Sequence, residues 1–281
     1  MDLTTISVDP YNTIYDSRDA NAIFESATDT IITGCKNTDL SGSVVIKAIG
    51  DYAFADGNLE GENGHLVLPE GIETIGFVSF GGCKKLKSVR MPQSLKEIGD
   101  FAFIQCENLE SVSLNDLFDI DDTTVGLRRI GQWAFANCYS LANIHIPASV
   151  SEMGDYVFQS CYGLTTVYFM SQRLTTIPEY TFYDCKNLNT IVLELNITKI
   201  GEAAFQRNND HAPRITLFFS GASQSDFQAM DISNIGNNDF ESAKVYYFSY
   251  YKPNPFVADT YWHYNSQVLA EIWQESDPEQ D

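Results

Sequence analysis

Six cysteines have the clearest chemical potential in this 281-residue chain. Cysteine can form disulfides, bind zinc or act as a nucleophile, and an even number in an extracellular protein often indicates disulfides. Five of the six obey one rule, because each lies three residues after a phenylalanine: Cys83, Cys106, Cys138, Cys161 and Cys185. This spacing ties them to a repeated structural unit.

Three interpretations of this cysteine row remain open: reduced thiols, disulfides and a metal site. Equivalent residues of stacked units have parallel Cβ vectors, which disfavours a disulfide although the Cα separation alone would permit one. Zinc needs converging tetrahedral ligands, which a parallel row does not supply. We expect a buried row of reduced thiols that pack as small apolar groups.

Cys35 is separate, because Ile32-Thr-Gly-Cys35 superficially resembles a lipoprotein cleavage site. Such a site follows an apolar segment, and charged residues take its place here. They are Asp16, Arg18, Asp19, Glu25 and Asp29. We expect Cys35 to belong to an N-terminal cap.

The four histidines form no metalloprotease motif, and the chain contains neither a Gly-x-Ser-x-Gly sequence nor a phosphate-binding loop. We therefore expect no catalytic residues, no cofactor and no metal site. Four carboxylates cluster in one inserted segment: Asp116, Asp119, Asp121 and Asp122. A calcium loop would need a glycine and a terminal glutamate, which are missing. A solvated acidic loop is the expectation, and calcium binding there is left open.

The elements that position these residues come from an internal repeat. The phrase Ile-Gly-x-x-Ala-Phe, with small variations, ends at Phe54, Phe80, Phe103, Phe135, Phe158, Phe182 and Phe205. These phenylalanines are 26, 23, 32, 23, 24 and 23 residues apart. A 23-residue unit is therefore the norm, with insertions of three residues after Phe54 and nine after Phe103.

Each unit combines two patterns. Period-two sequences such as Val89-Arg-Met91-Pro92 predict a short strand with one buried face, which proline ends. Ile98, Ala102 and Cys106, at i, i+4 and i+8, favour one side of a short helical segment. One unit cannot bury its own apolar side, so we expect seven or eight stacked rungs with a shared core, an α/β solenoid.

The outward columns of the strands are the candidate binding face. If Val89 and Met91 face the core, Arg90 faces solvent. We place Val67, Ser113, His145, Tyr168, Val192 and Thr216 in its column, and His65, Ser88, Ser111, Asn143, Thr166, Thr190 and Arg214 in the neighbouring one. An exposed aromatic among small polar groups is a suitable contact anchor. The candidate binding residues are Arg90, Asn143, His145, Thr166, Tyr168, Thr190 and Val192. The alternative is an ordinary polar strand face.

The consensus Leu-x-x-Val-x-Ile-Pro-x-Ser-Val-x-x-Ile-Gly-x-x-Ala-Phe-x-x-Cys resembles the BspA-type leucine-rich repeat, over about residues 40–219. Pro178 departs from it by replacing the glycine, which we expect to leave the fold intact. We divide the chain into an N-terminal cap with a β-hairpin (1–37), the repeats (38–220) and a C-terminal cap unit (221–281). In the last unit we expect a helix with Ser223 as its N-cap, a strand and a second hairpin.

The resemblance implies a bacterial surface or secreted protein that takes part in adhesion. The expected function is therefore non-enzymatic binding of a protein or glycan, with a host-derived ligand as one option. A structural spacer without a ligand is the alternative, and an enzyme is the second alternative.

Acidic residues outnumber basic ones 38 to 17, and the net charge of −21 disfavours nucleic-acid binding. No apolar run reaches the roughly 18 residues of a membrane span. Met1–Thr5 show no export signal, so either the chain is not exported or its signal lies outside the numbered sequence.

Overall fold

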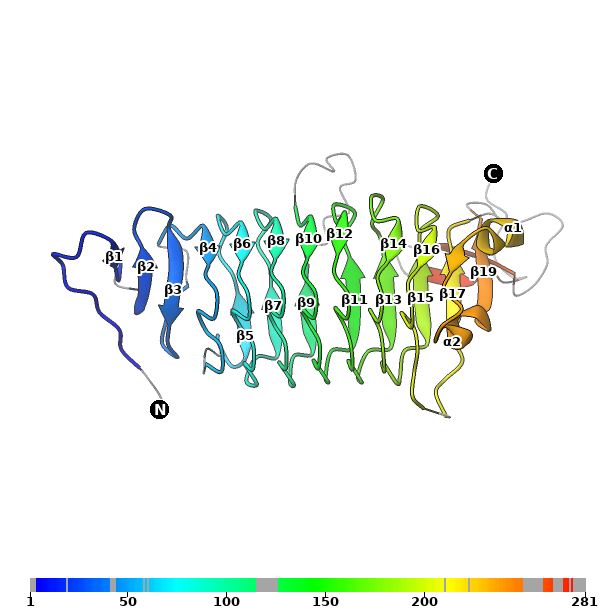
Figure 1. Ribbon diagram of the computed structural model, residues 1–281, viewed down its shortest axis with the longest axis horizontal. Helices are drawn as coiled ribbons and strands as arrows, with labels where there is room; N and C mark the ends of the chain where they lie inside the picture. The colour runs from blue at the N-terminus through cyan, green and yellow to red at the C-terminus, as the bar shows by residue number, and fades with distance from the viewer. Residues whose placement is uncertain are drawn as a thin grey trace.

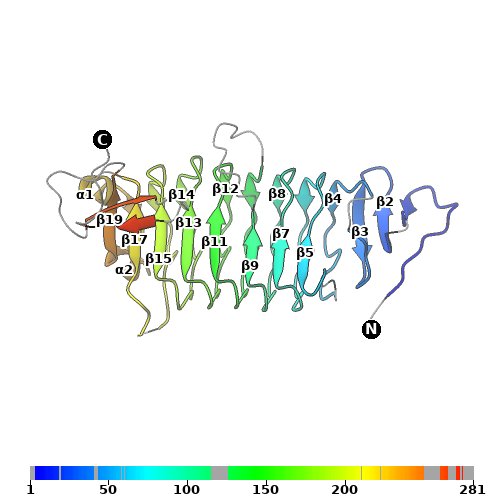
Figure 2. The ribbon, with the colours of Figure 1, turned by 180° about the vertical axis from the view of Figure 1, so that it is seen from behind.

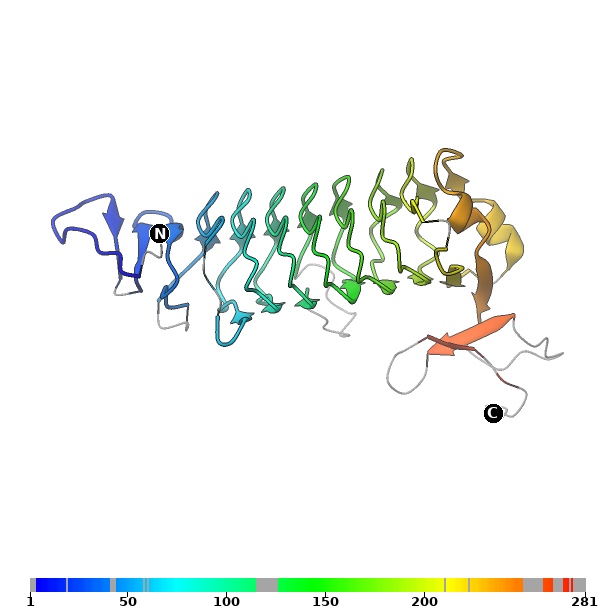
Figure 3. The same cartoon turned by 90° about the horizontal axis from the view of Figure 1, so that it is seen from below.

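The computed structural model describes residues 4–18, 20–40, 44–57, 59, 61–114, 126–209, 211–221, 223–249, 260–264, 270–272 and 274. The acidic residues of the insertion, Asp116, Asp119, Asp121 and Asp122, lie outside these residues. The described chain forms an elongated stack of coils that follow one another along a single axis (Figure 1). Short strands line two opposite sides of the stack (Figure 3). The predicted solenoid is confirmed.

The N-terminal end of the stack is a hairpin. Its strands are β1 (Tyr15–Asp16), β2 (Ala22–Glu25) and β3 (Thr30–Gly34), and β2 pairs antiparallel with both neighbours. β3 then pairs in parallel with the first strand of the solenoid. The predicted N-terminal hairpin therefore exists and continues one side of the stack.

Two-residue strands continue that side after β3. They are β4 (Ala48–Ile49), β6 (Thr74–Ile75), β8 (Glu97–Ile98), β10 (Arg129–Ile130) and β12 (Glu152–Met153) in one parallel run, and β14 (Thr176–Ile177), β16 (Lys199–Ile200) and β18 (Asp231–Ile232) in another. The sheet breaks between β12 and β14, next to Pro178. The glycine at this position elsewhere donates its N–H to the preceding coil, as Gly131 does to the Ile98 carbonyl. Proline has no N–H, yet β14 and β16 still pair in register.

Slightly longer strands form the opposite side. They are β5 (His65–Val67), β7 (Ser88–Arg90) and β9 (Ser111–Ser113), and then β11 (Asn143–Ile146), β13 (Thr166–Phe169), β15 (Thr190–Leu193), β17 (Thr216–Phe219) and β19 (Lys244–Phe248). All pairings within these two runs are parallel. Their alternate residues face the core, as the period-two pattern predicts.

The segment that follows the Ile-Gly dipeptide differs from the predicted short helix. Phe101 and Gln105 have φ of 59°, in the left-handed region, so the segment is a run of turns. Ala102 donates its N–H to Gly99 within its own turn, whereas Phe101 and Phe103 donate to Gln132 and Ala134 of the next coil. Because alternate N–H groups bond to the neighbouring coil, the i to i−4 pattern of a helix cannot form.

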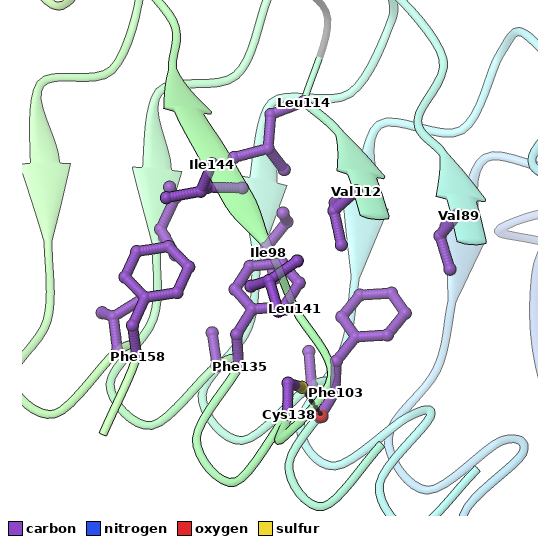
Figure 4. Close-up of a cluster of buried hydrophobic side chains, with 14 of the residues drawn as sticks. Val89, Ile98, Phe103, Val112, Leu114, Phe135, Cys138, Leu141, Ile144 and Phe158 are labelled. Carbon is purple, nitrogen blue, oxygen red and sulfur yellow. Dashed lines mark hydrogen bonds between the residues drawn. The ribbon is translucent and has the colours of Figure 1, made fainter. Parts of the chain in front are cut away.

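The core consists of side-chain columns that repeat from rung to rung. The phenylalanine column has ring centroids 4.6–5.6 Å apart with nearly parallel planes, from Phe54 to Phe240. Figure 4 shows Phe103, Phe135 and Phe158 on successive rungs beside the isoleucine and valine side chains. Such aligned burial is what lets units that cannot fold alone stabilise one another.

The C-terminal unit contains two short helices and a hairpin. Helix α1 (Gln224–Gln228) begins at the N-cap Ser223, whose hydroxyl accepts from the Asp226 amide in a capping box, as predicted for the N-cap. Helix α2 (Asn238–Glu241) precedes β19. β20 (Tyr261–Tyr264) pairs antiparallel with β21 (Ala270–Ile272). Figures 2 and 3 show this hairpin lying across the outer face of the sheet near β15 and β17.

In the part of the chain that the structure describes, no helix combines the length and apolar character needed to cross a bilayer.

Candidate functional site

The predicted binding residues lie on the outer face of the strands from β7 to β15. The parallel register aligns Asn143 with Thr166 and Thr190 in one column, and His145 with Tyr168 and Val192 in the next. Arg90 pairs with Ser113 in the second column, on the N-terminal side of the nine-residue insertion. The structure therefore places these residues on neighbouring columns of one face.

The centre of this face is a stacked pair of rings. The centroids of His145 and Tyr168 are 4.3 Å apart and their planes differ by 18°. Both side chains are half-buried, whereas Arg90 and Asn143 are exposed. Burial raises the pKa of the Tyr168 phenol above its usual value. A stacked, partly desolvated aromatic pair beside hydroxyl, amide and guanidinium donors can hold a ligand by ring contact and hydrogen bonding.

Val192 is not exposed, which corrects the prediction for this residue. Its side chain has 0% exposure, because the hairpin β20–β21 covers the outer face at this point. Trp262 of β20 is equally buried and donates its indole N–H to the Phe219 carbonyl at 3.0 Å. Val192, Phe218, Tyr246 and Trp262 form a second hydrophobic core outside the solenoid.

The register of the last repeat strand also differs from the prediction. Thr216 pairs with Thr190, and Phe218 pairs with Val192, so the predicted positions of Arg214 and Thr216 were wrong by two residues. The loop after Phe205 is longer than its equivalents: Phe182 precedes Thr190 by eight residues, and Phe205 precedes Thr216 by eleven. This longer loop shifts the strand relative to a constant spacing.

Sequence reasoning missed the aromatic row that continues from Tyr168 beneath the hairpin. Tyr168 packs against the edge of the second core, so the outward residues form a row in which Phe218 and Tyr246 are covered and Tyr168 and His145 are not. The signal was the density of aromatics in β17 and β19, where outward positions that are usually polar are aromatic. The uncovered end of this row is the candidate site.

The cysteine row is a structural feature of the core. All six cysteines are buried free thiols. Each of the five thiols of the cysteine row donates to the carbonyl of the phenylalanine one rung before it, as Cys138 does to Phe103 at 3.3 Å (Figure 4). Burial raises the pKa of the Cys83 and Cys161 thiols to about 12. Thiols with such pKa values are poor nucleophiles at neutral pH.

The described residues contain no group of three His, Cys, Asp or Glu side chains placed to hold a metal ion. The acidic insertion that the sequence offered for calcium lies outside those residues.

Comparison with protein families decides the relationship that the repeat suggests. Residues 47–125 and 118–228 match the BspA type leucine rich repeat region, in six copies. The chain belongs to the BspA-type leucine-rich repeat family. Leucine-rich repeats of this kind are generally non-enzymatic and commonly mediate binding. A comparison with curated proteins found no match.

Solved structures of other leucine-rich repeat proteins are similar to this BspA-type chain. A leucine rich repeat protein of Treponema pallidum has 22% identity and a TM-score of 0.49, covering 74% of this chain and 92% of its own. The pneumococcal vaccine antigen PcpA has 18% identity and a TM-score of 0.48, covering 82% and 50%. A leucine-rich repeat protein of Bacteroides ovatus has 20% identity and a TM-score of 0.37, covering 87% and 83%.

Proposed function

We propose that this BspA-type chain is a non-enzymatic binding module, presented at or outside a bacterial cell surface, that recognises a protein or a glycan. Membership of the repeat family supports both the binding role and the location. The ligand site that we propose is the outer face around His145 and Tyr168, with Arg90, Asn143, Thr166 and Thr190 around it.

The main support for this site is that the outward aromatic row emerges from beneath the hairpin β20–β21 at Tyr168. The hairpin buries Val192, Phe218 and Tyr246, but Tyr168 lies at the edge of that core and His145 stacks on it. Packing on one side holds the Tyr168 ring in place before a ligand arrives. A pre-ordered aromatic side chain loses little conformational entropy on binding, so contacts to it contribute most of their energy to affinity.

The surrounding polar groups would set the specificity. Asn143 and Arg90 are exposed, and Thr166 and Thr190 align with Asn143 on successive strands. Amide, hydroxyl and guanidinium groups donate to the hydroxyls and carboxylates of glycans and to the backbone carbonyls of proteins. Such groups beside an aromatic anchor are typical of binding surfaces.

The test is a binding screen followed by variants. The labelled full chain is applied to an array of mammalian extracellular proteins and glycans, with and without calcium, and the affinity for each hit is measured. We expect His145→Ala and Tyr168→Ala to weaken saturable binding about tenfold or more. Tyr139→Ala is the matched control, since Tyr139 also stacks on an aromatic ring of the next rung and lies on a different column.

Unchanged affinity in both site variants would remove this face as the ligand site. Absence of saturable binding to any arrayed protein or glycan would instead favour the structural spacer.

A further inference from the structure

A second aromatic ladder lies on the turns that follow the two-residue strands, away from the strands that carry His145 and Tyr168. Its rings are Tyr52, Phe77, Phe101, Trp133, Tyr156 and Tyr180, with each centroid 4.3–5.9 Å from the next. Tyr52 is 59% exposed, and Trp133, Tyr156 and Tyr180 are half-buried. This ladder does not belong to the hydrophobic core.

The backbone of the ladder would accept smaller residues more easily. Trp133, Tyr156 and Tyr180 have φ of 58°, 61° and 54°, in the left-handed region that bulky side chains disfavour. The second left-handed position of the same turns carries Asn137, Ser160 and Asp184. Polar residues such as Asn and Asp suit that conformation. Aromatic rings therefore occupy the first position despite a local backbone cost, which stacking between rungs helps to offset.

The C-terminal half of the ladder carries carboxylates without compensating cations. Asp155 and Glu179 immediately precede the ladder rings Tyr156 and Tyr180, and Glu202 holds the equivalent position on the next rung, before Ala203. Within the described residues none of these three carboxylates forms an ion pair. Farther along the N-terminal half, Arg129 engages Asp100 at 2.9 Å and Glu97 at 2.7 Å. Asp100 thus shares a cation with Glu97, whereas Asp155, Glu179 and Glu202 form no ion pair with another described residue.

These carboxylates help to raise the pKa values of the neighbouring tyrosine hydroxyls. Burial and the negative charges of Asp155, Glu179 and Glu202 raise the pKa of Tyr156. Donation of the Tyr180 hydroxyl to Glu202, together with burial and the negative charges of Glu202 and Glu179, raises the pKa of Tyr180 to about 12. These residues therefore form a surface with a negative local potential, which we call the acidic ladder surface. It consists of Trp133, Asp155, Tyr156, Glu179, Tyr180 and Glu202.

The ring geometry restricts what this surface can hold. Trp133 and Tyr156 lie nearly parallel, at 10°, as do Tyr156 and Tyr180, at 3°. The faces of the Tyr156 ring are therefore covered by its neighbours, and its edge is what remains for contact. A sugar ring that needs an open aromatic face finds none at Tyr156. Long side chains with an apolar stem and a cationic head fit better, since the stem can lie along ring edges while the head pairs with a carboxylate.

We propose that the acidic ladder surface docks an arginine- and lysine-bearing segment of a partner protein. Carboxylates at Asp155, Glu179 and Glu202 recur on successive rungs, so one extended segment can meet all three. This surface is independent of the proposed ligand site and does not rest on it. It gives the solenoid a second contact surface. This surface favours cationic partners, whereas the region around Arg90 favours anionic groups.

The test uses the full chain and a fluorescein-labelled peptide in which arginine and lysine alternate with glycine and serine. Binding is followed by fluorescence anisotropy at several salt concentrations. The variant is Asp155→Asn, Glu179→Gln and Glu202→Gln combined, which removes charge but keeps the acceptor oxygens that bond to the Glu179 amide and the Tyr180 hydroxyl. The matched control combines Glu62→Gln, Glu110→Gln and Glu241→Gln, exposed residues elsewhere, for the same change in net charge.

We expect the ladder variant to lose about tenfold or more in affinity, and the control to lose less than about twofold, because surface ion pairs act only at close range in salt. Peptide binding should also change the tryptophan emission of the chain, and this change should be absent in Trp133→Phe. The proposal would be overturned if both combined variants lost affinity equally or if the chain did not bind the peptide at all. It would also be overturned if a peptide with uncharged citrulline in place of arginine bound with equal affinity.

Discussion

At the scale of single residues, the interior of this chain consists of side chains that repeat those of the neighbouring rung. Phe135 stacks between Phe103 and Phe158, and the Cys138 thiol reaches the Phe103 carbonyl. A residue in such a column has few alternatives, because its neighbours on both sides fix its size and direction. The chemistry of cysteine is suppressed by that same environment.

Thiol labelling tests the buried cysteine row. In the native chain at pH 8, we expect the five thiols of the cysteine row to remain unmodified by a small thiol reagent, because burial raises their pKa and blocks access. In urea, all six cysteines should react. Mass spectrometry of the labelled chain gives the count. Rapid native labelling at Cys106 or Cys138 would contradict a closed core.

The repeat glycine is a second residue that the stack determines. A Cβ at Gly131 would lie 2.4 Å from the backbone nitrogen of Asp100 and 2.5 Å from the Gly99 carbonyl carbon. We therefore expect Gly131→Ala to force adjacent coils apart and to lower the free energy of unfolding by about 1–3 kcal/mol.

Urea unfolding monitored by circular dichroism measures this change. Gln132→Ala, at the exposed neighbour in the same turn, serves as the control and should shift stability by less than about 0.5 kcal/mol. Equal stability of Gly131→Ala and the control would show that the coils approach less closely.

At the scale of elements, periodicity predicted which strand residues face the core but not what covers the opposite side. Val192 obeys the alternation and points outward, yet a hairpin some seventy residues later in sequence buries it. The i, i+4, i+8 spacing at Ile98 fits both one side of a helix and a turn with alternating donors, so it could not distinguish them. The Ser223 N-cap was predictable because capping is decided within four residues.

Removing the covering side chain tests the role of the hairpin. Trp262→Ala deletes a fully buried indole and its hydrogen bond to Phe219, so we expect the C-terminal rungs to lose about 3–5 kcal/mol of stability. Hydrogen exchange should accelerate in β17 and β19 and stay unchanged in β7. Glu271→Ala, at an exposed position of β21, is the control. Unaltered exchange in β17 would show that the hairpin does not stabilise the sheet.

At the scale of the whole molecule, the chain is a one-dimensional array whose two sides carry different surfaces. Each rung contacts mainly its neighbours, so stability is a sum of rung and interface contributions. The sequence identified the array because its repeat survives insertions and the substitution of glycine by Pro178. It could not identify the candidate site fully, since the site ends where a cap folds back over the array. The outer strand face and the acidic ladder surface are thereby independent candidates for binding.

Deletion of one complete repeat tests the central account most directly. Removing residues 137–159 takes out 23 residues, joins Ala136 to Ser160 and keeps the Phe-x-x-Cys spacing between Phe135 and Cys161. Removing residues 148–159 takes out only half a unit. If aligned columns hold the molecule together, circular dichroism during urea unfolding will show a retained cooperative transition for the complete deletion and its loss for the half deletion. Equal tolerance of both deletions, or collapse of both, would contradict the account.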